Sequence, residues 1–146
     1  MVSIVRRFVE ETFEKLVGDP DAIFRISMAA HELLENAAKY SVGRRAVLRV
    51  VLEEQSEGGA GAYISLSNET TLDHVDRLKA RVDEINAAPE PFILYQEMMR
   101  RNLGSRDESG LGLVRIRAEG EMSLGCDVSG STVTIIASAR VLGRNQ

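Results

Sequence analysis

Helical and strand segments are separated along this chain, and this separation limits the fold more than any other feature of the sequence. Apolar residues recur at helical spacing in five segments and alternate with polar residues in four, which form two hairpins. The predicted helices span residues 4–17, 21–40, 71–86, 92–103 and a short segment ending near 120, and the predicted strands span 46–54, 62–67, 121–128 and 132–140. This order predicts an α+β fold, a two-layer sandwich with a mostly antiparallel sheet covered on one face by helices.

Length and composition exclude several classes of protein. The 146 residues predict a single domain over 1–146, with a helical lid insertion at about 70–109. One cysteine cannot form an internal disulfide or a cysteine-rich zinc site. The net charge of -4 argues against a nucleic-acid partner, and no apolar run approaches the ~18–20 residues of a membrane span. We therefore expect a cytoplasmic protein that binds neither nucleic acid nor a membrane.

The predicted helix over 21–40 carries the most informative side chains. At about 100° per residue its apolar side chains fall on one face. On the opposite face, Asn36 lies about 40° and Lys39 about −20° from Glu32, so that a carboxylate, an amide and an ammonium form a row. Neighbouring carboxylate and amide oxygens suit Mg²⁺, which takes few protein ligands and keeps waters and phosphate oxygens. Lys39 could meet phosphate charge directly. The alternative is a solvated polar face.

A glycine motif follows a polar loop near the end of the chain. Gly110 and Gly112 stand in the sequence GLGL, which opens the last predicted helix. Backbone N–H groups at such a helix start can cradle an anion. The alternative is a tight turn into a helix. Arg100, Arg101 and Arg106 precede the motif and could either reach phosphates or form a solvated helix end.

The ordered set of motifs resembles a known family. The segment from Glu32 to Lys39 reads E-x-x-x-N-A-x-K and is similar to the N-box of the GHKL (Bergerat-fold) ATPases. Residues 110–113 resemble the second glycine box of that family, and residues 130–132 resemble its terminal G-T box. The resemblance covers roughly residues 4–141. Among the family, the chain looks most like the stand-alone anti-sigma-factor serine kinases and histidine-kinase-like ATPase domains.

The resemblance implies ATP and Mg²⁺ as cofactors. Glu32 would be the catalytic residue that orients or deprotonates an acceptor hydroxyl, and Asn36 would hold Mg²⁺. The residues implied to bind the nucleotide are Asn36, Lys39, Asn68, Gly110, Gly112 and Thr132. Taken alone, Thr132 also reads as an ordinary strand residue.

The D-x-G-x-G box of the family is missing. Ser67 or Asn68 stands in the place of its aspartate, which accepts a hydrogen bond from the adenine amino group, and Glu69 or Thr70 stands where glycine is expected. The Asn68 carbonyl could still accept that bond, at a loss of roughly tenfold in affinity. A side chain in place of glycine would project where the nucleotide packs. Asp73 could replace the carboxylate only if the loop is rebuilt.

Two functions from different classes follow. The first is an ATP- and Mg²⁺-binding regulator in bacterial signalling that acts on a protein partner such as an anti-sigma antagonist domain. It would either phosphorylate a serine or threonine of this partner or sequester the partner. The second is a degenerate, non-catalytic relative with weak or no nucleotide binding, in which the helices at 71–86 and 92–103 engage a protein partner. Whether the chain is an enzyme, a Ser/Thr protein kinase, stays open at this point. A homodimer is among the assemblies that the sequence allows, and chance motif matches in an unrelated α+β protein are the third alternative.

Overall fold

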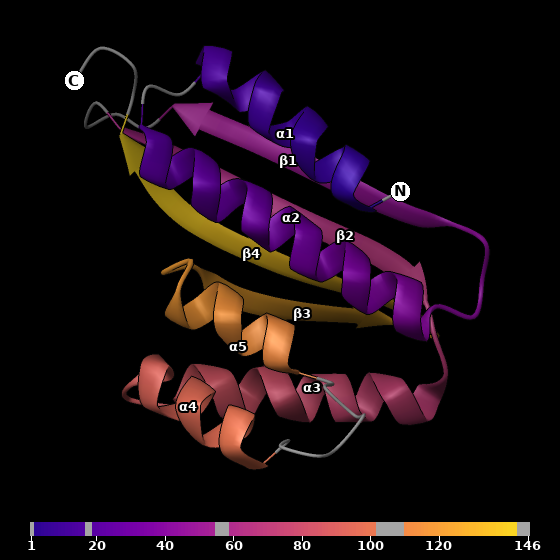
Figure 1. Cartoon of the computed structure of the whole chain (residues 1–146). Coiled ribbons are helices and arrows are strands. Elements are labelled where there is room, and N and C mark those ends of the chain that lie inside the picture. The colour runs from indigo at the N-terminus through magenta and orange to yellow at the C-terminus, as the bar shows by residue number, and fades with distance from the viewer. Residues whose placement is uncertain (1, 17–18, 55–58, 102–109, 143–146) are drawn as a thin grey trace.

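The computed structural model describes residues 2–16, 19–54, 59–101 and 110–142 (Figure 1). The elements follow one another as α1 (Val2–Leu16), α2 (Pro20–Tyr40), β1 (Ala46–Glu54), β2 (Gly59–Glu69), α3 (Leu72–Ala87), α4 (Pro91–Arg101), α5 (Leu111–Ala118), β3 (Ser123–Ser129) and β4 (Thr132–Leu142). This arrangement confirms the predicted α+β sandwich. Within these ranges no helix is long and apolar enough to cross a membrane.

The four strands form one antiparallel sheet in the order β1-β2-β4-β3. Each hairpin supplies one central and one edge strand, and the two hairpins join where β2 pairs with β4 along Gly59 to Glu69. In the tight turn between β3 and β4, Gly130 takes a φ of 62°, which glycine adopts at no steric cost.

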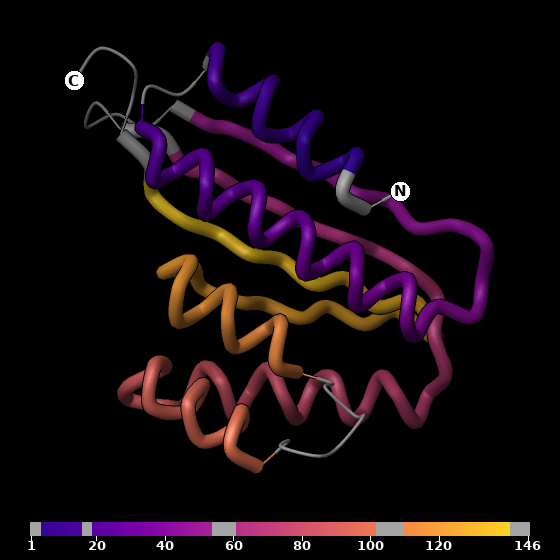
Figure 2. The backbone as a smooth tube through the Cα atoms, in the orientation of Figure 1, coloured from indigo at the N-terminus to yellow at the C-terminus, as the bar shows by residue number. Residues whose placement is uncertain are grey.

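One face of the sheet packs against the helices. Alternate residues of β2 and β4 are buried, as the two-residue period of a strand requires. They meet the apolar face of α2, which lies across the middle of the sheet, while α1 lies at the β1 side and α3, α4 and α5 lie at the β3 side (Figures 1 and 2). The buried residues of this contact are Ala62, Ile64 and Leu66 on β2, Val133, Ile135 and Ala137 on β4, and Ile26, Ala30, Leu33 and Ala37 on α2.

Helix α2 has well-formed caps at both ends. The sequence offers Asp19 and Asp21 as N-caps, and the structure uses Asp19, whose carboxylate accepts a hydrogen bond from the Asp21 N–H at 3.0 Å. Pro20 takes the first helical position, where its missing N–H costs nothing. At the other end the Ser41 N–H donates to the Ala37 carbonyl at 2.9 Å. The caps fix where α2 begins and ends.

Thr70 ties three parts of the fold together. Its hydroxyl donates to the Tyr40 carbonyl at the end of α2 at 2.7 Å, and its N–H donates to the Ser131 carbonyl in the β3–β4 turn at 3.0 Å. The next residue, Thr71, caps α3 by accepting from the His74 N–H at 3.2 Å. Thr70 is 2% exposed, so water has little access to its hydroxyl. The hydrogen bond to the Tyr40 carbonyl satisfies this buried donor within the protein.

The start of β2 differs from the prediction. The strand begins at Gly59 rather than at 62, so part of the segment expected to connect the first two strands is itself strand. β2 is a central strand with a paired strand on each side. This pairing provides hydrogen-bond partners for the backbone at Gly59 and Gly61, residues that by themselves favour a turn. The polar loop predicted at 105–109 lies outside the described residues. The proposed helical insertion is present as α3 and α4, and its role as a lid stays a prediction.

We expect Thr70→Val to destabilise the protein by about 1–3 kcal/mol, because the buried Tyr40 carbonyl would lose its donor while side-chain shape is kept. Urea denaturation measures this change. Thr12→Val is the matched control, since Thr12 makes the same type of bond, 2.7 Å to the Phe8 carbonyl, at an exposed position. The control should change stability by less than about 0.5 kcal/mol. Equal losses in the two variants would contradict this role of Thr70.

Candidate functional site

The polar row of α2 lines a cavity of about 530 Å³. Glu32, Asn36 and Lys39 reach this cavity because the opposite side of the helix, with Leu33 and Ala37, is buried on the sheet. A cavity of this size lies in the range of small-molecule sites, about 300–1,000 Å³. Within the row Glu32 and Asn36 are half-buried, whereas Lys39 is exposed.

The facing wall of the cavity is the start of α5. Gly110, Leu111 and Gly112 line it, together with Tyr95 from α4. Five of the seven residues predicted for the site thus meet around one cavity, three from α2 and two from the glycine motif. Their contacts with a nucleotide or metal stay predictions.

Both glycines of the motif lie in close contact with side chains of neighbouring helices. Gly110 caps α5 with a φ of 91°, in the left-handed region, and a Cβ there would collide with the side chain of Arg81 on α3. A Cβ at Gly112 would collide with the Glu32 carboxylate. The motif therefore brings the backbone of α5 directly against α2 and α3.

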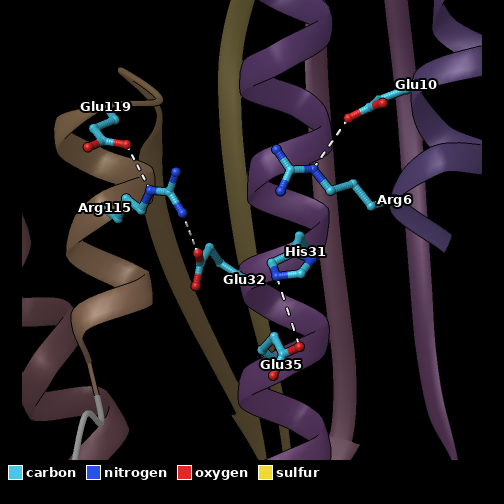
Figure 3. Close-up of polar contacts among 7 residues, drawn as sticks. All are labelled: Arg6, Glu10, His31, Glu32, Glu35, Arg115 and Glu119. Atoms are coloured by element: carbon cyan, nitrogen blue, oxygen red, sulfur yellow. Dashed lines mark hydrogen bonds and ion pairs between the residues drawn. The ribbon is translucent and has the colours of Figure 1, made fainter. Parts of the chain in front are cut away.

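An ion pair joins the two walls of the cavity (Figure 3). Arg115 donates from Nη1 to Oε1 of Glu32 at 3.0 Å and from Nε to Oε2 of Glu119 at 2.7 Å. The side chain of Glu32 is 16% exposed and that of Arg115 is 31% exposed, so the pair is only partly solvated. The hydrogen bond that Arg115 donates to Glu119 is the main cause that raises the pKa of the Arg115 guanidinium. Burial opposes this effect, and the charge of Glu119 and the hydrogen bond donated to Glu32 add to it. The predicted catalytic carboxylate is thus already bound by a cation.

Tyr95 completes this charged group. Burial raises the pKa of its phenol, and the negative charges of Glu119 and Glu32 raise it further.

Sequence reasoning did not find Arg115 as a site residue. The spacing of four residues between Arg115 and Glu119 is visible in the sequence and predicts their contact on one helix. The contact of Arg115 with Glu32, 83 positions earlier, has no such local signal.

A second cavity, of about 320 Å³, lies between α2 and α3. Asn36 and Gly110 line both cavities, so the two meet at these residues. Arg77 and Arg81 contribute cationic groups to the second cavity. Leu78 contributes a buried apolar surface.

His74 is a buried member of the second cavity. It is 6% exposed, its ring stacks on Tyr40 with 4.0 Å between ring centroids, and its Nε2 has no hydrogen-bond partner among the described residues. Burial, then the charge of Arg77, lowers the pKa of His74. His31, the other histidine of the chain, is half-buried on α2 with its Nε2 3.9 Å from the Glu35 carboxylate.

The structure does not bring Asn68 and Thr132 to the cavities. Asn68 is 8% exposed on the helix-facing side of β2, and its amide donates to the adjacent Glu69 carbonyl at 3.3 Å. Thr132 shares a side of β4 with Thr134, opposite the buried Val133. Neither residue lines the two cavities. Arg101 also lies elsewhere, 3.6 Å from Glu84.

The described residues contain no group of three or more His, Cys, Asp or Glu side chains that could hold a metal ion. A divalent cation at Asn36 would therefore take most of its oxygen ligands from water or from a bound phosphate. Mg²⁺ is commonly bound in this way, through one or two protein oxygens.

Comparison with known proteins gives a related fold. No family model matches the sequence, and no curated protein matches it. Among solved structures, a chain of the SiaB–SiaC complex from Pseudomonas aeruginosa has a TM-score of 0.65 at 14% sequence identity. The match covers 96% of this chain and 83% of that chain. At this identity the likeness shows the fold alone.

We expect a double-mutant cycle of Glu32→Gln and Arg115→Ala to give a coupling energy of about 1–2 kcal/mol in urea denaturation. This value lies between those of exposed pairs and fully buried pairs, as the partial exposure of the two side chains requires. The pair Arg6 and Glu10, 3.3 Å apart, is the control because it joins two turns of the single helix α1 rather than two helices (Figure 3). Its coupling should be about 0.3–0.5 kcal/mol. No difference between the two cycles would contradict a structural role for the Glu32–Arg115 pair.

His74 should make stability depend on pH. Because its folded pKa lies below the ordinary 6.5, the unfolded chain takes up a proton first as the pH falls. The stabilisation is therefore complete above about pH 6.5 and is lost as the pH falls toward the folded pKa. We expect His74→Phe, which keeps a ring beside Tyr40, to flatten the stability profile below pH 6.5 in urea denaturation. His31→Phe is the control and should keep the slope of the parent protein. An unchanged slope in His74→Phe would be inconsistent with this assignment.

Proposed function

We propose that this protein binds ATP with Mg²⁺ across the two adjoining cavities and acts as a regulator of a protein partner. The observation that carries the proposal is the position of Asn36 and Lys39 opposite the glycine-capped start of α5 in one cavity. Amide, ammonium and helix N-terminus are groups that together suit a metal-bound polyphosphate. The resemblance to the GHKL ATPases and the related fold of the SiaB–SiaC chain support the same function.

The start of α5 would hold phosphate. The first N–H groups of a helix have no partner within it, and Gly110 has no side chain with which to cap them. The positive end of the helix dipole favours an anion at this position. Lys39, exposed on the facing wall, would add a full positive charge from the other side.

Asn36 would hold Mg²⁺ through its side-chain oxygen, and Glu32 and Glu35 are the carboxylates that line the same cavity. The second cavity would take the nucleoside. There a buried leucine offers an apolar surface, the planar guanidinium groups of Arg77 and Arg81 can stack on a base, and His74 has an unpartnered nitrogen. These groups fit a nucleotide although the D-x-G-x-G aspartate is absent.

Within this proposal the protein is a Ser/Thr kinase of its partner. When bound, ATP supplies the phosphoryl group. Glu32 would orient or deprotonate the hydroxyl of a partner serine or threonine, and this requires that Arg115 release the carboxylate that it now holds. The structural neighbour is a chain of a complex of two proteins, which supports a protein partner, for which we propose an anti-sigma antagonist-like domain in the cytoplasm.

The Glu32–Arg115 ion pair favours a second candidate function. The Arg115 guanidinium occupies Oε1 of Glu32, so this oxygen is not free to accept a hydrogen bond from a partner hydroxyl. With the D-x-G-x-G box missing and Asn68 away from both cavities, the fold would then serve as a non-catalytic module that sequesters its partner.

Titration with a fluorescent ATP analogue, with and without Mg²⁺, tests nucleotide binding. We expect micromolar, Mg²⁺-dependent affinity, weakened about tenfold or more by Asn36→Ala or Lys39→Ala because each loses a contact to metal or phosphate. Lys79→Ala is the matched control for Lys39→Ala, since Lys79 is exposed on α3 and lines neither cavity. It should bind like the parent protein.

Absence of binding at millimolar nucleotide would overturn the proposal and leave the non-catalytic module. If the nucleotide binds, transfer of radiolabelled phosphate to a candidate partner separates a kinase from a binder. Glu32→Gln should then abolish transfer while nucleotide affinity is retained. Transfer that survives this substitution would contradict the role proposed for Glu32.

A further inference from the structure

The Glu32–Arg115 ion pair lies away from the junction of the two cavities. Asn36 and Gly110 line both cavities and therefore mark the junction. Further along, the backbone at Gly112 lies against the Glu32 carboxylate, and Arg115 then pairs with that same carboxylate (Figure 3). Residue numbers thus rise along α5 while they fall along α2, so the two helices run antiparallel beside the first cavity. The ion pair closes the part of this cavity that is farther from the junction.

An elongated ligand would bring its terminal group to this pair. In the proposed nucleotide complex, on which this inference rests, the nucleoside occupies the second cavity and the phosphates occupy the first. The phosphate chain leads away from the junction, so the terminal phosphate comes closest to Glu32 and Arg115. A carboxylate repels a phosphate, whereas a guanidinium binds it with charge-assisted hydrogen bonds, often two in parallel. Of the two side chains, Arg115 is the one suited to bind the terminal phosphate.

Arg115 can exchange one of its carboxylates and keep the other. Its Nε donates to Glu119 on the same helix at 2.7 Å, whereas its Nη1 donates to Glu32 on α2 at 3.0 Å. Because different nitrogens serve the two carboxylates, the bond to Glu32 can open while the bond to Glu119 holds the guanidinium in place. The Arg115 side chain lines the first cavity and is 31% exposed, so a ligand in that cavity can reach it.

We infer that Arg115 distinguishes a nucleoside triphosphate from a diphosphate and that this recognition frees Glu32. When no terminal phosphate is present, Arg115 holds Glu32 in the ion pair. When a terminal phosphate is bound, Arg115 donates to it, with Glu119 as the anchor that both states share. The Glu32 carboxylate is then free to accept a hydrogen bond from a partner hydroxyl. The ion pair would thus keep Glu32 blocked unless a transferable phosphate is present.

Titration of the full chain with fluorescent analogues of ATP and ADP tests the recognition of the terminal phosphate. We expect Arg115→Ala to weaken binding of the ATP analogue about tenfold or more and to change binding of the ADP analogue less than about twofold. Arg115→Gln, which keeps most of the side-chain length without the charge, should have the same effect. Arg117→Ala is the matched control, because Arg117 also lies on α5 but lines neither cavity. It should bind both analogues like the parent protein, and circular dichroism checks that each variant is folded.

The double-mutant cycle of Glu32→Gln and Arg115→Ala, measured by urea denaturation, tests the release of Glu32. With saturating ADP the coupling between the two residues should equal that of the protein without nucleotide, since the ion pair stays closed. With a saturating, non-hydrolysable ATP analogue the coupling should be lost, because Arg115 then contacts the phosphate in place of Glu32.

The possible results separate this inference from the proposed function. If neither nucleotide binds the parent protein, both fail. If nucleotides bind but Arg115→Ala and Arg115→Gln weaken ATP and ADP equally, or weaken neither, the inference alone is overturned. A coupling energy that is the same with the ATP analogue as with ADP would overturn the release of Glu32.

Discussion

The burial of one side of α2 on the sheet fixes the direction of its other side. Ile26, Leu33 and Ala37 are almost completely removed from water against β2 and β4, so the helix cannot rotate without exposing them. Glu32, Asn36 and Lys39 are consequently held in one direction, toward the start of α5. The placement of polar groups in the cavity is thus a consequence of apolar packing behind them.

The second wall is held by a different kind of contact. Gly112 allows the α5 backbone to approach the Glu32 carboxylate, and Arg115, one turn further, pairs with that same carboxylate. The Glu32 carboxylate therefore occupies the space beside Gly112 and also connects α2 with α5 through Arg115. An anionic ligand that approached Arg115 would compete with Glu32 for the guanidinium, so binding of such a ligand would release the Glu32 carboxylate from this cation.

Much of the architecture could be predicted from the sequence, because the periods of 3.6 and 2 are local and every helix and strand carries one of them. The alignment of the α2 row with the glycine motif could also be predicted from the order of motifs. Arg115 and His74 could not, since their roles depend on contacts between segments distant in the chain. Asn68 and Thr132 show the opposite problem. Their positions match the order of the family motifs, but Thr132 lies on the side of β4 opposite the buried Val133, and Asn68 lines neither cavity although it is on the helix-facing side of β2.

The two cavities communicate at Asn36 and Gly110, where an amide faces a residue without a side chain. A compact anion would occupy one of these cavities, whereas only an elongated molecule with chemically different ends would contact the lining of both at once. The arrangement of α2, α3 and α5 would thus discriminate between ligands by their length as well as by their charge.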